Sequence, residues 1–358
     1  MEINKTRRRK YRPLCAGLEV TLRCNMACVH CGSNATRSDR PGTLTHRDWL
    51  RVIDDLKAVG NRYVTLSGGE PFLYPRWREL VEHIRGRGMQ ANFISNGSLI
   101  TEDDIVFMKS RGVQHVGVSL DGDEAVHDRI RRHPGSFAAI MRLFELGRRH
   151  SFPVHIVTSI NKLNFPIREK ILRVMLRENV KLWQVQVVNS FGRAGMLRGK
   201  LLLEPPQYVR LCDDILRWKK AYRRRIRIEP ADSLGYCEPV TEELFGDCEW
   251  RGCNAGMYVV GIQADGTVLG CLSLQDKSFV AGNVKKRSLR AIWADDSAFA
   301  YTRRYDVSRM EGACGACASK RRCKAGCLGM AYSVGGSLRS NAYCYKTIVA
   351  SGRHSSNG

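Results

Sequence analysis

The sequence predicts an α/β fold: a partial (β/α)6 barrel of parallel strands followed by a C-terminal cysteine-rich extension. Strand-like and helical patterns alternate along the chain, and the alternation stops after Pro230, where cysteines become frequent. Strands that alternate with helices pair in parallel through right-handed crossovers, and such a unit curls into an open or closed barrel. We therefore expect a basic N-terminal segment at 1–16, a barrel at 17–230 and the extension at 231–358.

The elements of the barrel follow one another in order. The first strand begins at 17–22, and Thr45 then begins a helix that keeps Trp49 and Leu56 on one face. Apolar and β-branched runs predict the later strands, and capping residues with helical periodicity predict the helices between them. The expected strands are 63–66, 91–94, 116–120, 154–160, 182–188 and 226–228, and the expected helices are 77–87, 102–109, 136–149 (capped by Ser136), 166–178 and 206–223.

Composition and charge describe a chain without a membrane anchor. Of its 358 residues, 43% are hydrophobic, which permits a substantial core, and the formal net charge is +23. No apolar run approaches the roughly 20 residues of a membrane helix, so we expect a cytoplasmic protein with no membrane partner. The basic run at 5–10 is interpreted as a solvated tail. A positive surface can attract nucleic acid or an acidic peptide, but the sequence shows no nucleic-acid-binding signature.

Three cysteines in eight residues form the first candidate site. Cys24, Cys28 and Cys31 directly follow the first strand, and their spacing lets one short loop place three thiolates around a small iron–sulfur cluster. Three ligands for four irons leave one iron open to a substrate or cofactor. The alternative is a zinc loop with His30 as fourth ligand, which would strain so short a loop because structural zinc sites draw on two separated pairs of ligands.

The extension holds a second group of cysteines. The chain has 14 cysteines, and a chain of this length without an export signal more often uses clustered cysteines for metal than for disulfides. A pair of structural zinc sites is the alternative, since zinc held by four cysteines is common. The run 261–268, with an Asp-Gly turn, predicts a hairpin between the first two members. The group consists of Cys253, Cys271, Cys314, Cys317, Cys323, Cys327 and Cys344.

Glycines and polar residues follow the other strands, at the end where parallel barrels place their chemistry. The run 67–71, Ser-Gly-Gly-Glu-Pro, follows the second strand, and its glycines let backbone groups approach a ligand closely. Asp121, after the fourth strand, is expected on the rim. For each polar residue the alternative role is the capping of a turn. The others are Ser95 and Asn96 after the third strand, Ser119 at the end of the fourth, Asn161 after the fifth, and the segment 189–194 after the sixth.

Together, the cysteine loop, the Gly-Gly-Glu-Pro run and the later cysteines resemble the radical S-adenosylmethionine (SAM) enzymes with a SPASM extension. The resemblance implies that a 4Fe–4S cluster on the cysteine loop chelates SAM through its open iron and cleaves it to a 5′-deoxyadenosyl radical. It also implies which residues contact SAM: Gly68, Gly69 and Glu70 at the amino group, Ser95 and Asn96 at the ribose, Arg131 at the carboxylate, Ser119 and Asn161 on the cofactor side, and the His30 backbone near adenine.

The resemblance to SPASM proteins implies two auxiliary 4Fe–4S clusters. The first would take Cys253, Cys271 and Cys327, with Cys248 as the nearest candidate for the fourth ligand, and the second would take Cys314, Cys317, Cys323 and Cys344. Among the remaining cysteines, Cys212 shares an apolar helical face and is expected to be buried. Cys15 is given no role, and Cys237 is either structural or a residue that faces the substrate.

The resemblance most often implies modification of peptides, so we expect hydrogen abstraction from a ribosomally made precursor peptide, with crosslink formation or another oxidative maturation. The expected electron donor is a protein such as flavodoxin or ferredoxin, and the leader peptide would be recognised either by a separate leader-peptide-binding protein or by the barrel surface itself. Because the first strand begins near residue 18, we expect no fused leader-binding domain ahead of it.

Other functions stay open at this point. The main alternative is a dehydrogenase or epimerase of a small metabolite such as an aminoglycoside or sugar, with Cys237 as hydrogen-atom donor. Sulfatase maturation is weaker, because His30 stands where that group usually carries an aromatic residue. A non-enzymatic metal protein that binds nucleic acid through its basic face would have no need of the Gly-Gly-Glu-Pro run.

Overall fold

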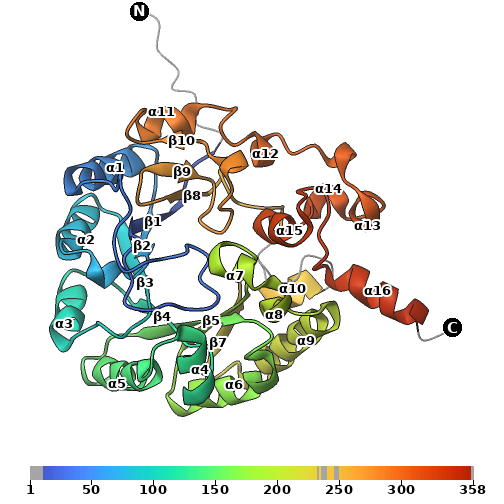
Figure 1. Cartoon of the computed structure of the whole chain (residues 1–358), viewed down its shortest axis with the longest axis horizontal. Coiled ribbons are helices and arrows are strands. Elements are labelled where there is room, and N and C mark those ends of the chain that lie inside the picture. Colours follow the sequence, from blue (N-terminus) through green and yellow to red (C-terminus); the bar gives the residue numbers. More distant parts are fainter. Residues whose placement is uncertain (1–10, 232–233, 235–239, 246–249, 356–358) are drawn as a thin grey trace, which may run out of the picture.

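Residues 11–231, 234, 240–245 and 250–355 are described by the computed structural model, and their strands form one curved sheet (Figure 1). The strand order is β10-β9-β8-β1-β2-β3-β4-β5-β6-β7. Neighbours from β1 to β7 pair in parallel, which confirms the predicted partial barrel. These strands are β1 Cys15–Thr21, β2 Tyr63–Gly68, β3 Gln90–Ser95, β4 Val116–Ser119, β5 Val154–Ile160, β6 Leu182–Val187 and β7 Arg227–Pro230. Cys15 is therefore the first residue of β1, whereas the expected bounds had placed it in the segment before the barrel.

Helices lie around the outside of this sheet (Figure 1). Among the described residues, no helix is long and apolar enough to cross a bilayer. The helices in this part of the chain are α1 His46–Ala58, α2 Trp77–Gly86, α3 Glu102–Ser110, α4 Glu124–Arg131, α5 Ser136–Arg149, α6 Arg168–Arg177, α7 Gly192–Met196, α8 Arg198–Leu201 and α9 Pro205–Tyr222, with 3-10 turns η1 Pro71–Leu73 and η2 Phe165–Ile167; of these, α7 lies near the centre of the view in Figure 1.

The helix starts follow local capping chemistry. Thr45 forms a capping box with Asp48 at the start of α1, as its position predicts. Ser136 was expected to cap α5, and this is wrong: the cap is Gly135, at φ +81°, and Ser136 is the first helical residue. The Ser136 hydroxyl donates to Asp128 Oδ1 at 2.7 Å instead. That bond ties α5 to α4, a helix that the sequence pattern did not predict.

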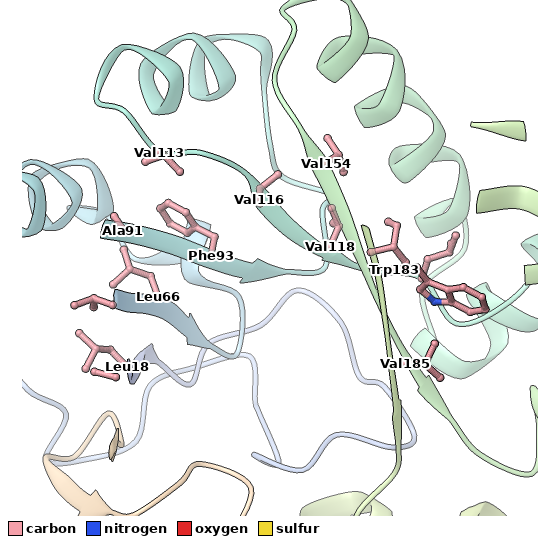
Figure 2. Close-up of a cluster of buried hydrophobic side chains, with 14 of the residues drawn as sticks. Leu18, Leu66, Ala91, Phe93, Val113, Val116, Val118, Val154, Trp183 and Val185 are labelled. Carbon is pink, nitrogen blue, oxygen red and sulfur yellow. The ribbon is translucent and has the colours of Figure 1, made fainter. Parts of the chain in front are cut away.

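A continuous apolar core lies between the sheet and its helices. Leu18, Leu66, Phe93 and Val118, on successive strands, belong to one buried cluster (Figure 2). Cys212 of α9 is fully buried in the same cluster, which confirms the packing role expected from its helical face. The core therefore fixes the outer face of every barrel strand, and the alternate side chains point to the inside.

The extension continues the barrel sheet. β8 pairs in parallel with β1, with Val260 opposite Ala16, and β9 returns antiparallel to β8. The predicted hairpin is confirmed, with Gly266 at φ +89° in its turn. The sequence did not predict that its first strand would join the barrel. The remaining elements are β8 Val259–Ile262, β9 Thr267–Leu269, β10 Gly282–Asn283, α10 Val240–Phe245, α11 Leu289–Ala294, α12 Ala300–Arg303, α13 Gly312–Gly315, α14 Lys320–Cys323, α15 Leu328–Gly335 and α16 Tyr345–Ser355, with 3-10 turns η3 Lys277–Phe279 and η4 Val307–Arg309.

Two histidines stack near the amino ends of the central strands. The rings of His115, just before β4, and His155, on β5, have centroids 4.1 Å apart. Burial, followed by the charges of His115 and Arg227, lowers the pKa of His155 to about 4. Both rings are therefore neutral in the folded protein near pH 7.

We predict that this pair makes stability depend on pH below neutrality. Because the pKa of His155 is lowered from 6.5 to about 4, the unfolded chain takes up a proton at a higher pH than the folded chain does. The stabilising contribution of neutral His155 is complete above about pH 6.5 and is lost as the pH falls from there toward about 4. His155→Asn removes this titration, so its unfolding temperature should fall less than that of the wild type across the window. His133→Asn, in the turn between α4 and α5, is the control; equal slopes for wild type and His155→Asn would contradict the prediction.

Candidate active site

A cavity of about 680 Å³ opens where the strands of the barrel end. Its lining comes from the cysteine loop that follows β1, from residues at the ends of β2 to β7, and from the extension. Cysteines from two distant parts of the chain therefore face one space. They are Cys24, Cys28 and Cys31 from the loop and Cys253, Cys271 and Cys327 from the extension.

Each sulfur of the cysteine loop has a nitrogen donor beside it. Burial raises the pKa of Cys24 to about 11 and also raises that of Cys28, so a thiolate here needs a positive partner. N–H donors to cluster-bound sulfurs are among the features that set cluster potentials. The three thiols therefore fit an iron–sulfur cluster, which they would hold. The donors are the Met26 amide at 3.4 Å from Cys24 Sγ, Arg131 Nη1 at 3.8 Å from Cys28 Sγ and the Ala35 amide at 3.5 Å from Cys31 Sγ.

The segment after β6 holds the cysteine loop in place. Arg193 of α7 donates from Nε to the Cys28 carbonyl at 2.8 Å and from Nη1 to the Ala35 carbonyl at 2.7 Å. Its amide donates to the Cys31 carbonyl at 3.0 Å. Gly192, at φ +54°, lies so close that a Cβ there would stand 2.5 Å from the Cys31 carbonyl oxygen. Only glycine allows this approach, so α7 and the loop behave as one unit.

The Gly-Gly-Glu-Pro run packs against the base of the same loop. The Gly69 amide donates to the Thr21 carbonyl at 2.7 Å, and the Glu70 amide donates to the Arg23 carbonyl at 2.8 Å. Gly68 has φ +136°, and a Cβ on it would lie 2.1 Å from the Thr21 carbonyl oxygen. Both glycines line the cavity. Their backbone is therefore open to a ligand on one side and fixed to β1 on the other.

Glu70 supports the cavity from behind and is not part of its lining. Its buried carboxylate accepts from the Ser95 hydroxyl at 2.7 Å and from the Asn96 amide at 2.8 Å. Burial raises the pKa of Glu70 to about 7 despite these donors. Ser95 and Asn96 do line the cavity, and Asn96 Nδ2 lies 4.0 Å from Cys24 Sγ. Glu70 thus positions two residues that face the cavity.

Asp121 was expected on the rim, and this is wrong: it is fully buried, because α4 closes over the end of β4. Its Oδ2 lies 2.5 Å from Arg131 Nη2 and 3.4 Å from His30 Nε2, and its amide donates to His127 Nδ1 at 3.0 Å. Burial alone would raise the pKa of Asp121, but the charge of Arg131 holds it below its ordinary value. Burial lowers the pKa of His30 to about 4, so its ring is neutral at neutral pH.

The two remaining cofactor-side residues differ. Ser119 lines the cavity and Asn161 does not. Asn161 Oδ1 accepts from the Leu163 amide at 2.9 Å, and its Nδ2 donates to the Ser159 carbonyl at 3.0 Å. This is the turn-capping role that the sequence left as the alternative.

Unpaired polar atoms on the lining fit a polar cofactor such as SAM. They are buried, and none has a hydrogen-bond partner among the residues that the structure describes. A buried donor or acceptor without a partner is costly, so a ligand that pairs with it is favoured. The atoms are His30 Nδ1, Arg131 Nε and Asn189 Oδ1.

The other cysteines of the extension form a second group outside the cavity. Burial raises the pKa of Cys323 to about 12, and Cys344, Cys314 and Cys317 add to this effect, so the four thiols are neighbours. They would hold the second auxiliary cluster, and the three extension cysteines on the cavity would hold the first. Within the described part of the chain, no three His, Cys, Asp or Glu side chains lie close enough together to hold a single metal ion. Cys237 and Cys248 lie outside the described residues.

Sequence reasoning missed Arg193 as a support of the cysteine loop. Its partners are backbone carbonyls, which leave no trace in a residue pattern. The available signal was its place in the segment 189–194, which was identified only as a whole among the polar residues that follow the strands.

Known proteins resemble this chain in sequence and fold. Residues 18–174 match the Radical SAM superfamily, and residues 253–323 match SPASM, an iron-sulfur cluster-binding domain. An AdoMet-dependent heme synthase of Oleidesulfovibrio alaskensis is 29% identical over 336 residues, which cover 89% of this chain and 83% of that protein. The mycofactocin maturase MftC of Mycobacterium tuberculosis is 29% identical over 328 residues, covering 90% and 80%.

The fold has solved counterparts as well. The crystal structure of Streptococcus suis SuiB bound to S-adenosylmethionine superposes with a TM-score of 0.72 at 17% identity, over 92% of this chain and 76% of that one. At that identity the likeness concerns the fold. The two domain matches confirm the resemblance inferred from the cysteine patterns.

We predict that Gly68→Ala disrupts the cysteine loop. The new Cβ would meet the Thr21 carbonyl oxygen at 2.1 Å in a backbone conformation at φ +136°, a clash that costs about 1–3 kcal/mol or displaces the loop. Iron bound after anaerobic reconstitution should therefore fall. Gly86→Ala is the matched control, because a Cβ there meets nothing within 4 Å. Equal iron content in both variants would contradict the prediction.

We also predict that Arg193→Ala loosens the same loop from the other side. Each lost hydrogen bond from a charged group is worth about 1.5–3 kcal/mol, so SAM-induced changes in the EPR spectrum of the reduced cluster should weaken or disappear. Arg193→Lys should restore them in part, because lysine keeps the charge but not the fork of donors. Arg173→Ala, exposed on α6, is the control. A spectrum for Arg193→Ala that responds to SAM like the wild type would refute the role.

Proposed function

We propose, from the premise that this chain is a radical SAM enzyme with a SPASM domain, that it carries out the oxidative maturation of a ribosomally made precursor peptide. The observation that carries the proposal is that the cysteine loop and three cysteines of the extension, Cys253, Cys271 and Cys327, line one shared cavity. A substrate held there would lie between the site of hydrogen abstraction and a site that can accept an electron. That arrangement suits a net oxidation of the substrate.

The chain's own residues would divide the work as follows. Cys24, Cys28 and Cys31 would hold the cluster that, with SAM bound, supplies a 5′-deoxyadenosyl radical. The backbone of Gly68 and Gly69 would face the methionine end of SAM, as their place on the lining supports. Further SAM contacts would come from Ser95, Asn96, Ser119 and Arg131, with Glu70 acting through Ser95 and Asn96.

Arg131 would donate from the Nε edge of its guanidinium to the SAM carboxylate, while Asp121 holds the guanidinium in place. Its Nη2 is taken by the Asp121 carboxylate, and its Nε has no partner among the described residues. Burial disfavours the charge of Arg131, but Asp121 raises its pKa above the ordinary value. A permanently charged, pre-positioned donor of this kind suits a carboxylate ligand.

Several features support a peptide as the substrate. A relative of 29% identity is a mycofactocin maturase. The lining is rich in amides that can both donate to and accept from a peptide backbone, including Gln184, Gln186 and Gln275. The net charge of +23 would attract an acidic leader segment over long range. An electron donor such as flavodoxin or ferredoxin and a separate leader-binding protein would complete the system.

A second candidate function is the oxidation of a small molecule. It is favoured by the relatives named AdoMet-dependent heme synthase, at 28–29% identity over most of this chain. Against it, the cavity of about 680 Å³ would have to hold the nucleotide cofactor as well as the substrate. One peptide side chain fits that space more readily than a macrocycle.

The experiment is an anaerobic assay of the fully loaded enzyme. With SAM and dithionite it should yield 5′-deoxyadenosine, and with a short peptide encoded beside its gene the peptide should lose hydrogen atoms by mass spectrometry. Cys24→Ala should yield no more 5′-deoxyadenosine than a protein-free mixture. Cys15→Ala, exposed at the start of β1, is the matched cysteine control.

The outcomes separate the two candidates. A peptide that keeps its mass while a porphyrin-type substrate is converted would favour the second. No 5′-deoxyadenosine from the loaded wild type would overturn both.

A further inference from the structure

One wall of the cavity carries Glu229, a residue that has no role in the assignments above. It is formed by the inner faces of β5, β6 and β7. We propose that Glu229, with Gln184 and Gln186, forms a subsite for a cationic side chain, lysine or arginine, of the peptide. This inference rests on the proposed function, because it names the part of a peptide that the cavity selects.

The strand register brings the wall together. Gln184 of β6 pairs with Val157 of β5 on one side and with Glu229 of β7 on the other, and Gln186 pairs with Ser159. All five line the cavity. Trp183 and Val185, which alternate with the glutamines, belong to the buried cluster on the opposite face of the sheet (Figure 2).

The charged side chains on the cavity lining differ in whether they are available to a substrate. Glu229 is the single carboxylate among the described lining residues. The two arginines there are already engaged, Arg131 with Asp121 and Arg193 with carbonyls of the cysteine loop. The carboxylate of Glu229 is therefore the charge that a substrate can meet on this wall.

The present partners of Glu229 are replaceable. Its Oε1 contacts Arg227, whose side chain is 75% exposed, and the Glu229 side chain is itself 37% exposed. Ion pairs between groups this exposed contribute little, so a cation that enters the cavity can displace or share the contact. The charge of Glu229 also acts on Lys219 of α9 and favours its protonated form, but the Lys219 ammonium donates its hydrogen bond to the Leu244 carbonyl.

The floor beside the wall suits the stem of such a side chain. Ile94 of β3 lines the cavity with 37% of its surface exposed, and Val157 of β5, which pairs with Gln184, lines the cavity as well. The intervening strand carries Gly117, where a Cβ would meet Ile94 Cδ1 at 2.8 Å. Lysine and arginine lay an apolar stem along such a surface and keep the charged end at a polar group. A neutral aliphatic side chain would leave Glu229 unused, and an acidic one would be repelled.

This local preference is opposite in sign to the whole chain. A net charge of +23 attracts acidic segments generally, whereas Glu229 selects a cation at one position. The two effects separate in an experiment, because a change at Glu229 leaves the long-range attraction almost unaltered.

The test is affinity selection on the holoenzyme. Anaerobically reconstituted, immobilised enzyme with SAM is exposed to an equimolar library of synthetic dodecapeptides, and residue frequencies among the retained peptides are read by mass spectrometry. Wild type should enrich lysine and arginine relative to Glu229→Gln by about fivefold, the upper end for a partly exposed ion pair. Acetylation of the library's lysines should abolish their share of this enrichment. Arg227→Ala, which removes the competing cation, should increase it.

The control is Glu82→Gln. Glu82 on α2 is similarly exposed, at 45%, and pairs with Arg111 at 2.8 Å, but it lies off the cavity. This variant should select like the wild type. Iron content checks the loading of each variant.

Two failures are distinguishable. Peptides retained with the same residue frequencies by wild type and Glu229→Gln would overturn the subsite alone. A wild type that retains no peptide above bare resin would overturn the peptide class itself.

Discussion

The carbonyl oxygens of Thr21, the last residue of β1, and of Arg23 accept hydrogen bonds from the amides of Gly69 and Glu70, which ties the turn after β2 to the start of the cysteine loop. From the other side, Arg193 binds two further carbonyls of that loop. The cysteine loop is thus held by contacts to its backbone carbonyls on both flanks. Such contacts tolerate no side chain in between, which is why glycine stands at the close approaches.

A buried ion pair between Arg131 and Asp121 supports the cysteine loop from a third direction. A buried carboxylate without a partner would be costly, and so would a buried guanidinium, so each depends on the other. The arginine also lies beside the sulfur of Cys28. Asp121 and Cys28 thus contact the same guanidinium, so Arg131 links the end of β4 to the cysteine loop.

Much of the architecture could be predicted from the sequence, because alternating periodicities, Thr45 and the Asp-Gly turn are local signals. That the cysteines of the loop gather on one cavity with Cys253, Cys271 and Cys327 of the extension agrees with the two groups seen in the sequence, because clustered cysteines in a chain of this length favour metal binding. Contacts between distant segments were not predictable. The burial of Asp121 depends on a short helix without a strong apolar pattern, and Arg193 reaches backbone atoms. Glu229 was missed because a single carboxylate on a strand becomes informative only when its neighbours across the sheet are known.

β1 has two neighbours, β2 on one edge and β8 on the other, so that Cys15 lies between Tyr63 and Val259. During synthesis on the ribosome, most of the chain must emerge before the second edge is covered. Until then, the strand that leads into the cysteine loop exposes a row of unpaired amides and carbonyls, which is a template for misassembly with other nascent chains. Shortened versions that end before β8 would keep that edge permanently. By pairing β8 with β1, the extension covers the free edge of the strand that leads into the cysteine loop.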